Sequence, residues 1–213
     1  MQIGIICEGG DVSKVRNSTT DNPDARVIER FINLIAPGHK FEFVPLRDKP
    51  NLKAQCGNAT KLLLTVARCN AVIICWDLYP ATWGIIAERQ ARPCRAEDRA
   101  AILESLERAG VTHPHVYLLC VEAELETLLL SDERALSEVL STETKPIALT
   151  KSKRDGGVNP KKALAKLFST HKKKYNPAIH NPLIAKAIPD TVRLKRNESF
   201  SRLIEKLRLL GTV

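Results

Sequence analysis

The sequence predicts an α/β protein with a mainly parallel sheet flanked by helices. Short apolar runs alternate with longer segments whose apolar residues recur at helical spacing, and this strand–helix order repeats along the chain. The strand-like runs are apolar throughout instead of alternating with polar residues, which is typical of strands buried on both faces. The order of elements and the buried strands together favour one sheet with helices on both sides.

The expected strands cover residues 3–7, 41–44, 71–76 and 116–121. Asp24 stands where it could cap a helix that runs to Ile35. Helices are also expected over residues 59–67, 97–109 and 124–140. In the segment 59–67, the side chains of Leu62, Leu63 and Val66 are expected to form the buried face.

Charge divides the chain into two parts. Residues 1–144 contain 16 Lys and Arg against 20 Asp and Glu, whereas residues 145–213 contain 17 against 4. The second part predicts short helices over residues 160–168, 181–187 and 199–210. We therefore expect an α/β domain over residues 1–144 and a basic α-helical C-terminal region over residues 145–213 that packs on it.

Composition excludes several classes of protein. Hydrophobic residues make up 44% of the chain and charged residues 27%, as in ordinary globular proteins. No apolar run approaches the roughly 20 residues of a membrane-spanning helix, so no membrane partner is expected. The six cysteines form no Cys-x-x-Cys pair and no signal-peptide pattern is present. These features favour reduced, buried thiols over a zinc site and predict a cytoplasmic protein.

Acidic residues follow three of the expected strands. Glu8, Asp77 and Glu122 come directly after a strand, and Glu124 and Glu126 follow at once. Because the carboxyl ends of parallel strands meet at one edge of a sheet, these side chains are expected to lie together. Clustered carboxylates repel one another unless a cation lies between them or one holds a proton, and their hard oxygen atoms suit Mg²⁺ or Mn²⁺. The alternative is that they are solvated loop residues or favour the start of the next helix.

Such a metal centre usually acts on a phosphate ester, because the metal offsets charge on the attacked phosphorus. ATP hydrolysis by this chain is not expected. Gly9 and Gly10 are not followed by the Gly-Lys-Ser/Thr of a phosphate-binding P-loop.

Four stretches of the chain resemble a known group of proteins. They are Glu8-Gly9-Gly10, Asp77, residues 121–129, and residues 159–164 with the basic helical end. The first two are similar to the TOPRIM arrangement, the metal-binding domain of topoisomerases, primases and overcoming-lysogenization-defect nucleases. All four together resemble a bacterial family of TOPRIM-like domains of unknown function, found near ABC-type ATPases in defence-associated operons.

The resemblance implies roles for individual residues. Glu8 matches the TOPRIM glutamate, a general acid/base or metal ligand, and Asp77 matches the first aspartate of the Asp-x-Asp motif. Tyr79 stands where that motif has its second aspartate, so one of the glutamates after the fourth strand would supply the missing ligand. The catalytic candidates are Glu8, Asp77 and Glu122, and the candidate metal ligands are these three with Glu124 and Glu126.

Basic residues of the C-terminal region are candidates for contact with DNA or RNA. Dense Lys and Arg side chains neutralise phosphates without reading the base sequence, and the scarcity of aromatic residues gives little support for base stacking. The candidates are Lys161, Lys162, Lys172, Lys173, Lys174, Arg193, Lys195 and Arg196. The alternatives are a solvated basic face and a contact to an acidic partner.

Two functions are consistent with these patterns. The first is a Mg²⁺-dependent TOPRIM-like nuclease that works with a separately encoded ATPase in anti-phage defence; the ATPase and the defence role come only from the resemblance. The second is a non-catalytic TOPRIM-like subunit that regulates an ATPase complex or binds nucleic acid. The missing second aspartate favours the second function.

Overall fold

The computed structural model describes residues 1–9, 22–78, 95–122, 124–150 and 159–208. Within these residues, four parallel strands form one sheet in the order β2-β1-β3-β4. The strands are β1 (Gln2–Cys7), β2 (Lys40–Pro45), β3 (Ala71–Leu78) and β4 (Val116–Glu122). The predicted α/β fold with a mainly parallel, helix-flanked sheet is therefore confirmed.

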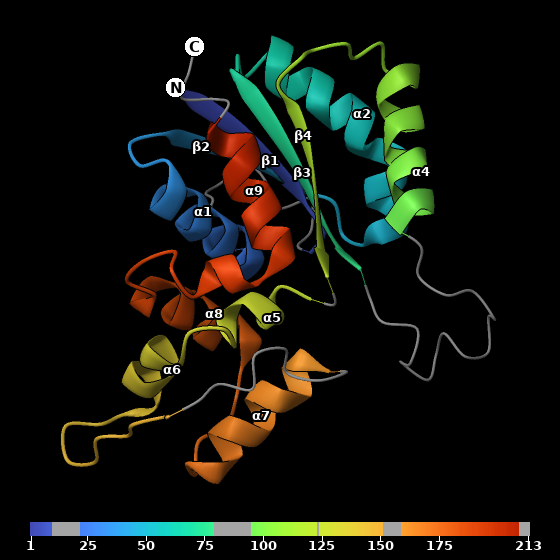
Figure 1. Ribbon diagram of the computed structural model, residues 1–213. Helices are drawn as coiled ribbons and strands as arrows, with labels where there is room; N and C mark the ends of the chain where they lie inside the picture. The colour runs from blue at the N-terminus through green and yellow to red at the C-terminus, as the bar shows by residue number, and fades with distance from the viewer. Residues whose placement is uncertain (10–21, 79–94, 123, 151–158, 209–213) are drawn as a thin grey trace, which may run out of the picture.

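Helices cover both faces of the sheet (Figure 1). Successive strand residues point to opposite faces, so Ile5 and Ile73 lie in one core and Ile6 and Ile74 in the other. The first core is closed by α1 (Pro23–Ile35) and α9 (Glu198–Arg208), and the second by α2 (Lys49–Thr65) and α4 (Arg95–Arg108). This two-sided burial explains why the strand sequences are apolar throughout.

The start of α1 differs from the prediction. Asn22, not Asp24, caps the helix: its side-chain oxygen accepts hydrogen bonds from the backbone N–H groups of Asp24 and Ala25 at 3.0 and 3.1 Å. Pro23 occupies the first turn, where its missing N–H is not needed. The carboxylate of Asp24 is therefore available for another role.

Helix α2 is longer than predicted and turns a different face inward. It begins at Lys49, capped by Asp48, and Leu63 is buried as expected. Leu62 and Val66 are instead 58% and 73% exposed. The reason is the contact with α4, which fixes the rotation of the helix. A Cβ atom on Gly57 would lie 1.9 Å from the carbonyl oxygen of Ser105, so only glycine permits this approach.

The predicted single helix over residues 124–140 is wrong. Two helices form there, α5 (Glu126–Leu129) and α6 (Glu133–Leu140). Asp132 separates them, because its side chain caps α6 by accepting from the backbone N–H groups of Arg134 and Ala135. Ser131 ends the first helix with a hydrogen bond to the carbonyl of Leu128.

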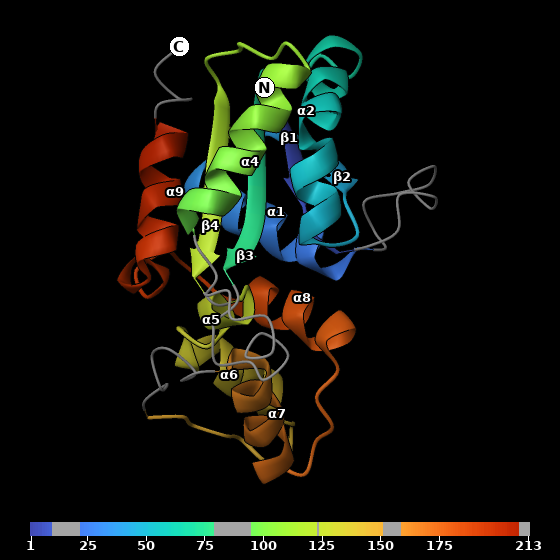
Figure 2. The same cartoon turned by 90° about the vertical axis from the view of Figure 1, so that its right-hand side faces the viewer.

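The C-terminal helices share a core with the sheet. Phe200 of α9 packs edge-on against Phe31 of α1, with ring centroids 5.6 Å apart. Arg30 of α1 donates to the carbonyl oxygens of Ala185 and Ile188 at the end of α8 (Pro177–Ala187). Helices α5, α6, α7 (Pro160–Thr170) and α8 lie beyond the carboxyl ends of the strands (Figure 2), with a short 3-10 turn over Leu194–Arg196 before α9.

No helix among the described residues is long and apolar enough to cross a membrane. The cysteines in this part of the chain form no disulfide: Cys7, Cys56, Cys69, Cys75 and Cys120 are all buried free thiols.

Candidate metal centre

The carboxyl ends of β1 and β3 bring Glu8 and Asp77 together. The two strands are neighbours, and Cys7 pairs with Cys75 in register, so the residues that follow meet at the same edge. The backbone N–H of Asp77 donates to Glu8 Oε1 at 3.1 Å. This hydrogen bond holds the carboxylate of Glu8 at the end of β3.

Two further glutamates reach the same region from the segment after β4. Glu124 is fully buried and Glu126, the first residue of α5, is 3% exposed. The ammonium group of Lys161, from the first turn of α7, lies 2.8 Å from Glu124 Oε1 and 4.0 Å from Glu126 Oε1. Lys161 is thus the cation that pairs with these two acids.

Asp24, at the start of α1, completes the group. Its charge interacts with that of Glu126 and also contributes to the raised pKa of Asp77. We call Glu8, Asp24, Asp77, Glu124 and Glu126 the acidic centre. Its members contact the end of β3 on one side and residues of α7 and α8 on the other. Figure 2 shows these helices beyond the carboxyl ends of β3 and β4.

The acidic centre disfavours full ionisation. Burial raises the pKa of Asp77 well above its usual value, and the charges of Glu8, Glu126, Asp24 and Glu124 raise it further. Burial, with the charge of Glu126, raises the pKa of Asp24 to about 6. Burial also raises the pKa of Glu124, although Lys161 opposes the shift. A cation placed among these carboxylates would remove the repulsion.

Glu126 is held by a chain of buried polar side chains. Asn181, fully buried in α8, donates from Nδ2 to Glu126 Oε1 at 3.0 Å. The hydroxyl of Tyr175 in turn donates to Asn181 Oδ1. Burial raises the pKa of Tyr175, and so do Glu126 and Glu124, so its hydroxyl remains a donor.

The side chains of the acidic centre are of the chemical type that binds a hard divalent cation. All five side chains are carboxylates, and Glu124 Oε2 is buried without a hydrogen-bond partner in the described part of the chain. The arrangement is not preformed, however. Among the described residues, no three His, Cys, Asp or Glu side chains are already gathered as a metal-binding group. Binding would therefore require movements of these side chains and of Lys161.

The remaining predicted acid is Glu122. Its backbone is the last residue of β4, which places it at the same sheet edge as Glu8 and Asp77. Its side chain lies outside the described part of the structure.

The basic candidates divide into two groups. Three make contacts within the protein: Lys161 pairs with Glu124, Lys173 donates to the carbonyls of Val139 and Ser141, and Arg193 pairs with Glu133. The others are exposed on α7, on the turn after it and on the turn before α9: Lys162, Lys172, Lys174, Lys195 and Arg196.

Sequence reasoning missed three members of the site. Asp24 was interpreted as a helix cap, although the Asn-Pro pair at residues 22–23 is itself a strong cap signal that would have left Asp24 unassigned. Tyr175 and Asn181 gave no signal, because nothing in the sequence shows that α8 lies over α5. Lys161 was noticed, but as a surface residue.

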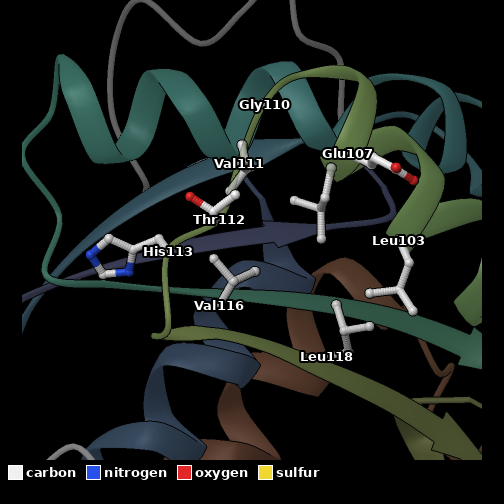
Figure 3. Close-up of a pocket in the computed structure, with 9 residues that line it drawn as sticks. Leu103, Glu107, Gly110, Val111, Thr112, His113, Val116 and Leu118 are labelled. Carbon is white, nitrogen blue, oxygen red and sulfur yellow. The ribbon is translucent and has the colours of Figure 1, made fainter.

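A separate hollow of about 370 Å³ lies at the opposite end of β4, between that strand and the end of α4 (Figure 3). Apolar side chains from both elements line it, among them Leu103, Val116 and Leu118. Glu107 and His113 are the titratable residues on its rim. Its lining lacks the clustered carboxylates of the acidic centre, so we place the candidate site at the acidic centre.

Residues 25–208 match a family described as Domain of unknown function (DUF4276). The chain belongs to this family. No curated protein matches the sequence of this DUF4276 member. Among solved structures, it is similar to the C-terminal region of the Burkholderia pseudomallei OLD protein, with a TM-score of 0.48 and 14% sequence identity over 97% of each chain.

Proposed function

We propose that this DUF4276 protein is a TOPRIM-like, Mg²⁺- or Mn²⁺-dependent nuclease that acts in the cytoplasm with a separately encoded ATPase, in anti-phage defence. The ATPase and the defence role rest on the family resemblance of the sequence. The chemical part of the proposal rests on the acidic centre.

One observation carries the proposal. Glu8 and Asp77, the two residues that match the TOPRIM motif, are joined by the 3.1 Å hydrogen bond from the backbone of one to the carboxylate of the other. Three further carboxylates raise the pKa of Asp77 from around this pair. If these acids were only solvated loop residues, their side chains would be exposed to solvent. Glu124 and Glu126 are instead buried. Such an arrangement is favourable when a cation is bound there.

In this proposal Glu8, Asp77 and Glu122 are the catalytic residues, and Glu124 and Glu126 complete the candidate metal ligands. A bound Mg²⁺ or Mn²⁺ would offset the charge that develops on the attacked phosphate. Glu8, or a glutamate with a raised pKa such as Glu124, would accept or donate the proton of the hydrolysis.

Substrate binding is assigned to the exposed basic residues near α7 and before α9. Lys162, Lys172, Lys174, Lys195 and Arg196 are exposed and would contact backbone phosphates of DNA or RNA. Lys161 is beside the acidic centre, so it would meet a phosphate only at the site of cleavage. Lys173 and Arg193, which hold neighbouring elements, would contribute mainly through their charge.

The test is a nuclease assay with Mg²⁺ or Mn²⁺ on single- and double-stranded DNA and RNA. Wild type, Glu8→Gln and Asp77→Asn are compared, with Glu205→Gln on the exposed side of α9 as the matched control. We expect cleavage by wild type and the control and a loss of at least about 100-fold in the two site variants. Equal cleavage by all four proteins, or no cleavage of any nucleic acid by the wild type, would contradict the proposal.

The ion pair of Lys161 favours a second candidate function, a non-catalytic TOPRIM-like subunit. Its ammonium group already lies 2.8 Å from Glu124 and neutralises part of the charge that a metal would neutralise. In that case the chain would regulate an ATPase complex or bind nucleic acid without cleaving it.

Calorimetry with Mn²⁺ distinguishes the two functions. The nuclease requires saturable binding that Asp77→Asn removes, whereas the non-catalytic subunit predicts no binding while the chain still co-purifies with its ATPase. Lys161→Met, compared with Lys162→Met, shows whether the ion pair blocks the site. Tighter Mn²⁺ binding in the first variant alone would mean that the lysine competes with the metal.

A further inference from the structure

The polar chain from Tyr175 through Asn181 to Glu126 has a direction that chemistry fixes. A carboxylate can only accept hydrogen bonds, so the amide group of Asn181 must turn its Nδ2 toward Glu126. Its Oδ1 then faces away and requires a donor, which the Tyr175 hydroxyl supplies. The amide oxygen and the amide nitrogen of Asn181 thus each have a partner.

The surroundings hold both members of this chain in place. Asn181 is fully buried in the first half of α8. The ring of Tyr175 stacks on His180 at 5.9 Å and packs against Phe168 at 5.2 Å between centroids. Since buried polar groups are costly unless bonded, a buried amide that satisfies a carboxylate on one side and a phenol on the other leaves Glu126 little freedom to turn.

The two glutamates after β4 therefore differ in what holds them. The ammonium group of the half-exposed Lys161 lies 2.8 Å from Glu124 Oε1 but 4.0 Å from Glu126 Oε1, and Glu126 is bound in addition by the neutral amide of Asn181 at 3.0 Å. After Glu8, Glu126 is the largest of the charges that act on Asp77. These contacts single out Glu126 as the acid that stands in for the absent second aspartate of the Asp-x-Asp motif.

We infer that Asn181 and Tyr175 are positioning residues that hold Glu126 toward Asp77 as a cation ligand of the acidic centre. The inference rests on the proposed function and adds to it which glutamate completes the site and what orients it. Neither residue touches the cation itself; both act through Glu126.

A double-mutant cycle on Mn²⁺ affinity tests the inference. The variants are Asn181→Leu, Tyr175→Phe and Glu126→Gln, alone and in pairs, with the dissociation constant measured by calorimetry. Loss of a partner that orients a metal ligand weakens binding by about tenfold or more, which we expect for Asn181→Leu. Tyr175→Phe keeps the ring packing, acts one bond further away, and is expected to cost about threefold. In the Glu126→Gln background, neither change should alter the affinity further.

The control variant is Asn197→Ala. Asn197 also uses its side chain within the fold, because it accepts from the backbone N–H groups of Ser199 and Phe200 at the start of α9, but it is not bonded to the acidic centre. It should lower the melting temperature and leave Mn²⁺ affinity unchanged, which separates loss of stability from loss of positioning.

Each result has one meaning. Losses that persist in the Glu126→Gln background, or an unchanged affinity in both single variants, overturn the inference and leave the proposed nuclease standing. Wild-type protein that binds no Mn²⁺ overturns the proposed function and the inference with it. If Asn181→Leu fails to fold, Tyr175→Phe alone carries the cycle.

Discussion

Asp132 is fully buried beside two arginines, whereas Asp77 faces four other carboxylates. We call Asp132, Glu133, Arg134, Asp190 and Arg193 the α6 corner. There Arg134 lies 2.7 Å from Asp132 and 3.0 Å from Asp190, and Arg193 pairs with Asp132 and Glu133. Although burial opposes it, the hydrogen bonds from Arg134 lower the pKa of Asp132. In the acidic centre the pKa shifts run the other way.

The charges of the α6 corner are paired and stabilise the fold, whereas those of the acidic centre repel one another. In the part of the chain that the structure describes, Lys161 forms ion pairs with two acids of the acidic centre, Glu124 and Glu126. The carboxylates around Asp77 still raise its pKa in the folded protein. This is the pattern expected where a site binds an external cation.

The largest expected effect comes from breaking the α6 corner. Asp132→Ala removes the cap of α6 and leaves Arg134 and Arg193 without their buried partner. We expect the free energy of unfolding to fall by about 3 kcal/mol. Urea unfolding at pH 7 measures it. A loss below about 1 kcal/mol would show that the two arginines find other partners in Glu133 and Asp190.

The second effect is a pH dependence of stability that arises from a raised pKa, in contrast to the lowered pKa of Asp132. The pKa of Asp24 is about 6 in the folded chain, above its usual value, so folding favours its protonated form. This contribution is complete below pH 4 and is lost as the pH rises through 6. Asp24→Asn should therefore stabilise the metal-free protein by about 2 kcal/mol at pH 7, after allowance for solvent screening, and by almost nothing at pH 4.

Unfolding in urea at several pH values, in the presence of a chelator, measures this dependence. Asp48→Asn is a useful comparison, because Asp48 caps α2 away from the acidic centre. It should destabilise the protein instead. An Asp24→Asn variant that is less stable than wild type at pH 7 would mean that the acidic centre is not under repulsion.

A third and smaller effect tests a buried acid that has lysine partners. Asp98 of α4 lies 3.3 Å from Lys49 and 2.8 Å from Lys53 of α2, and its side chain is 8% exposed. Asp98→Asn keeps the shape and removes the charge, so we expect a loss of about 1 kcal/mol in the free energy of unfolding. A gain in stability would mean that the charge of Asp98 destabilises the fold, as we expect for Asp24, and that its two lysine partners do not compensate for its burial.

The smallest effect belongs to an exposed pair. Glu198 is 73% exposed and lies 2.7 Å from Arg202 one turn later in α9. Glu198→Gln should lower the free energy of unfolding by about 0.3 kcal/mol, because solvent and salt screen such a pair. Thermal unfolding at low and high salt measures it. A loss above about 1 kcal/mol would show that the contribution of an ion pair to stability does not follow its solvent exposure in this protein.

Local patterns were sufficient to predict the four strands and the helices α1 and α4, but not the extent of α2 or the break between α5 and α6. The strands are recognisable because burial on both faces leaves no polar position, and the pairing of Glu8 with Asp77 follows from the order of parallel strands alone. The rotation of α2 could not be predicted. It depends on Gly57 meeting the backbone of Ser105, which lies 48 residues away.

The acidic centre was predictable only in part for the same reason. Glu8 directly follows β1 and Asp77 is the second-last residue of β3, so the sheet brings them together. Asp24 and Asn181 come from helices α1 and α8, and Tyr175 comes from the connection before α8. The positions of these segments are set by tertiary contacts, for which the sequence carries no short-range signal. The sequence groups Lys161 with the other basic residues of the C-terminal region, because it stands in a segment that is dense in Lys and Arg.

The position of α9 has a consequence for synthesis on the ribosome. Phe200, Leu203 and Leu207 cover the face of the sheet that α1 leaves open. Until residues 198–208 have emerged, β4 and its neighbours present an apolar surface to the cell. The nascent chain would therefore need a chaperone to shield this surface, or rapid completion of synthesis, until α9 packs on the sheet.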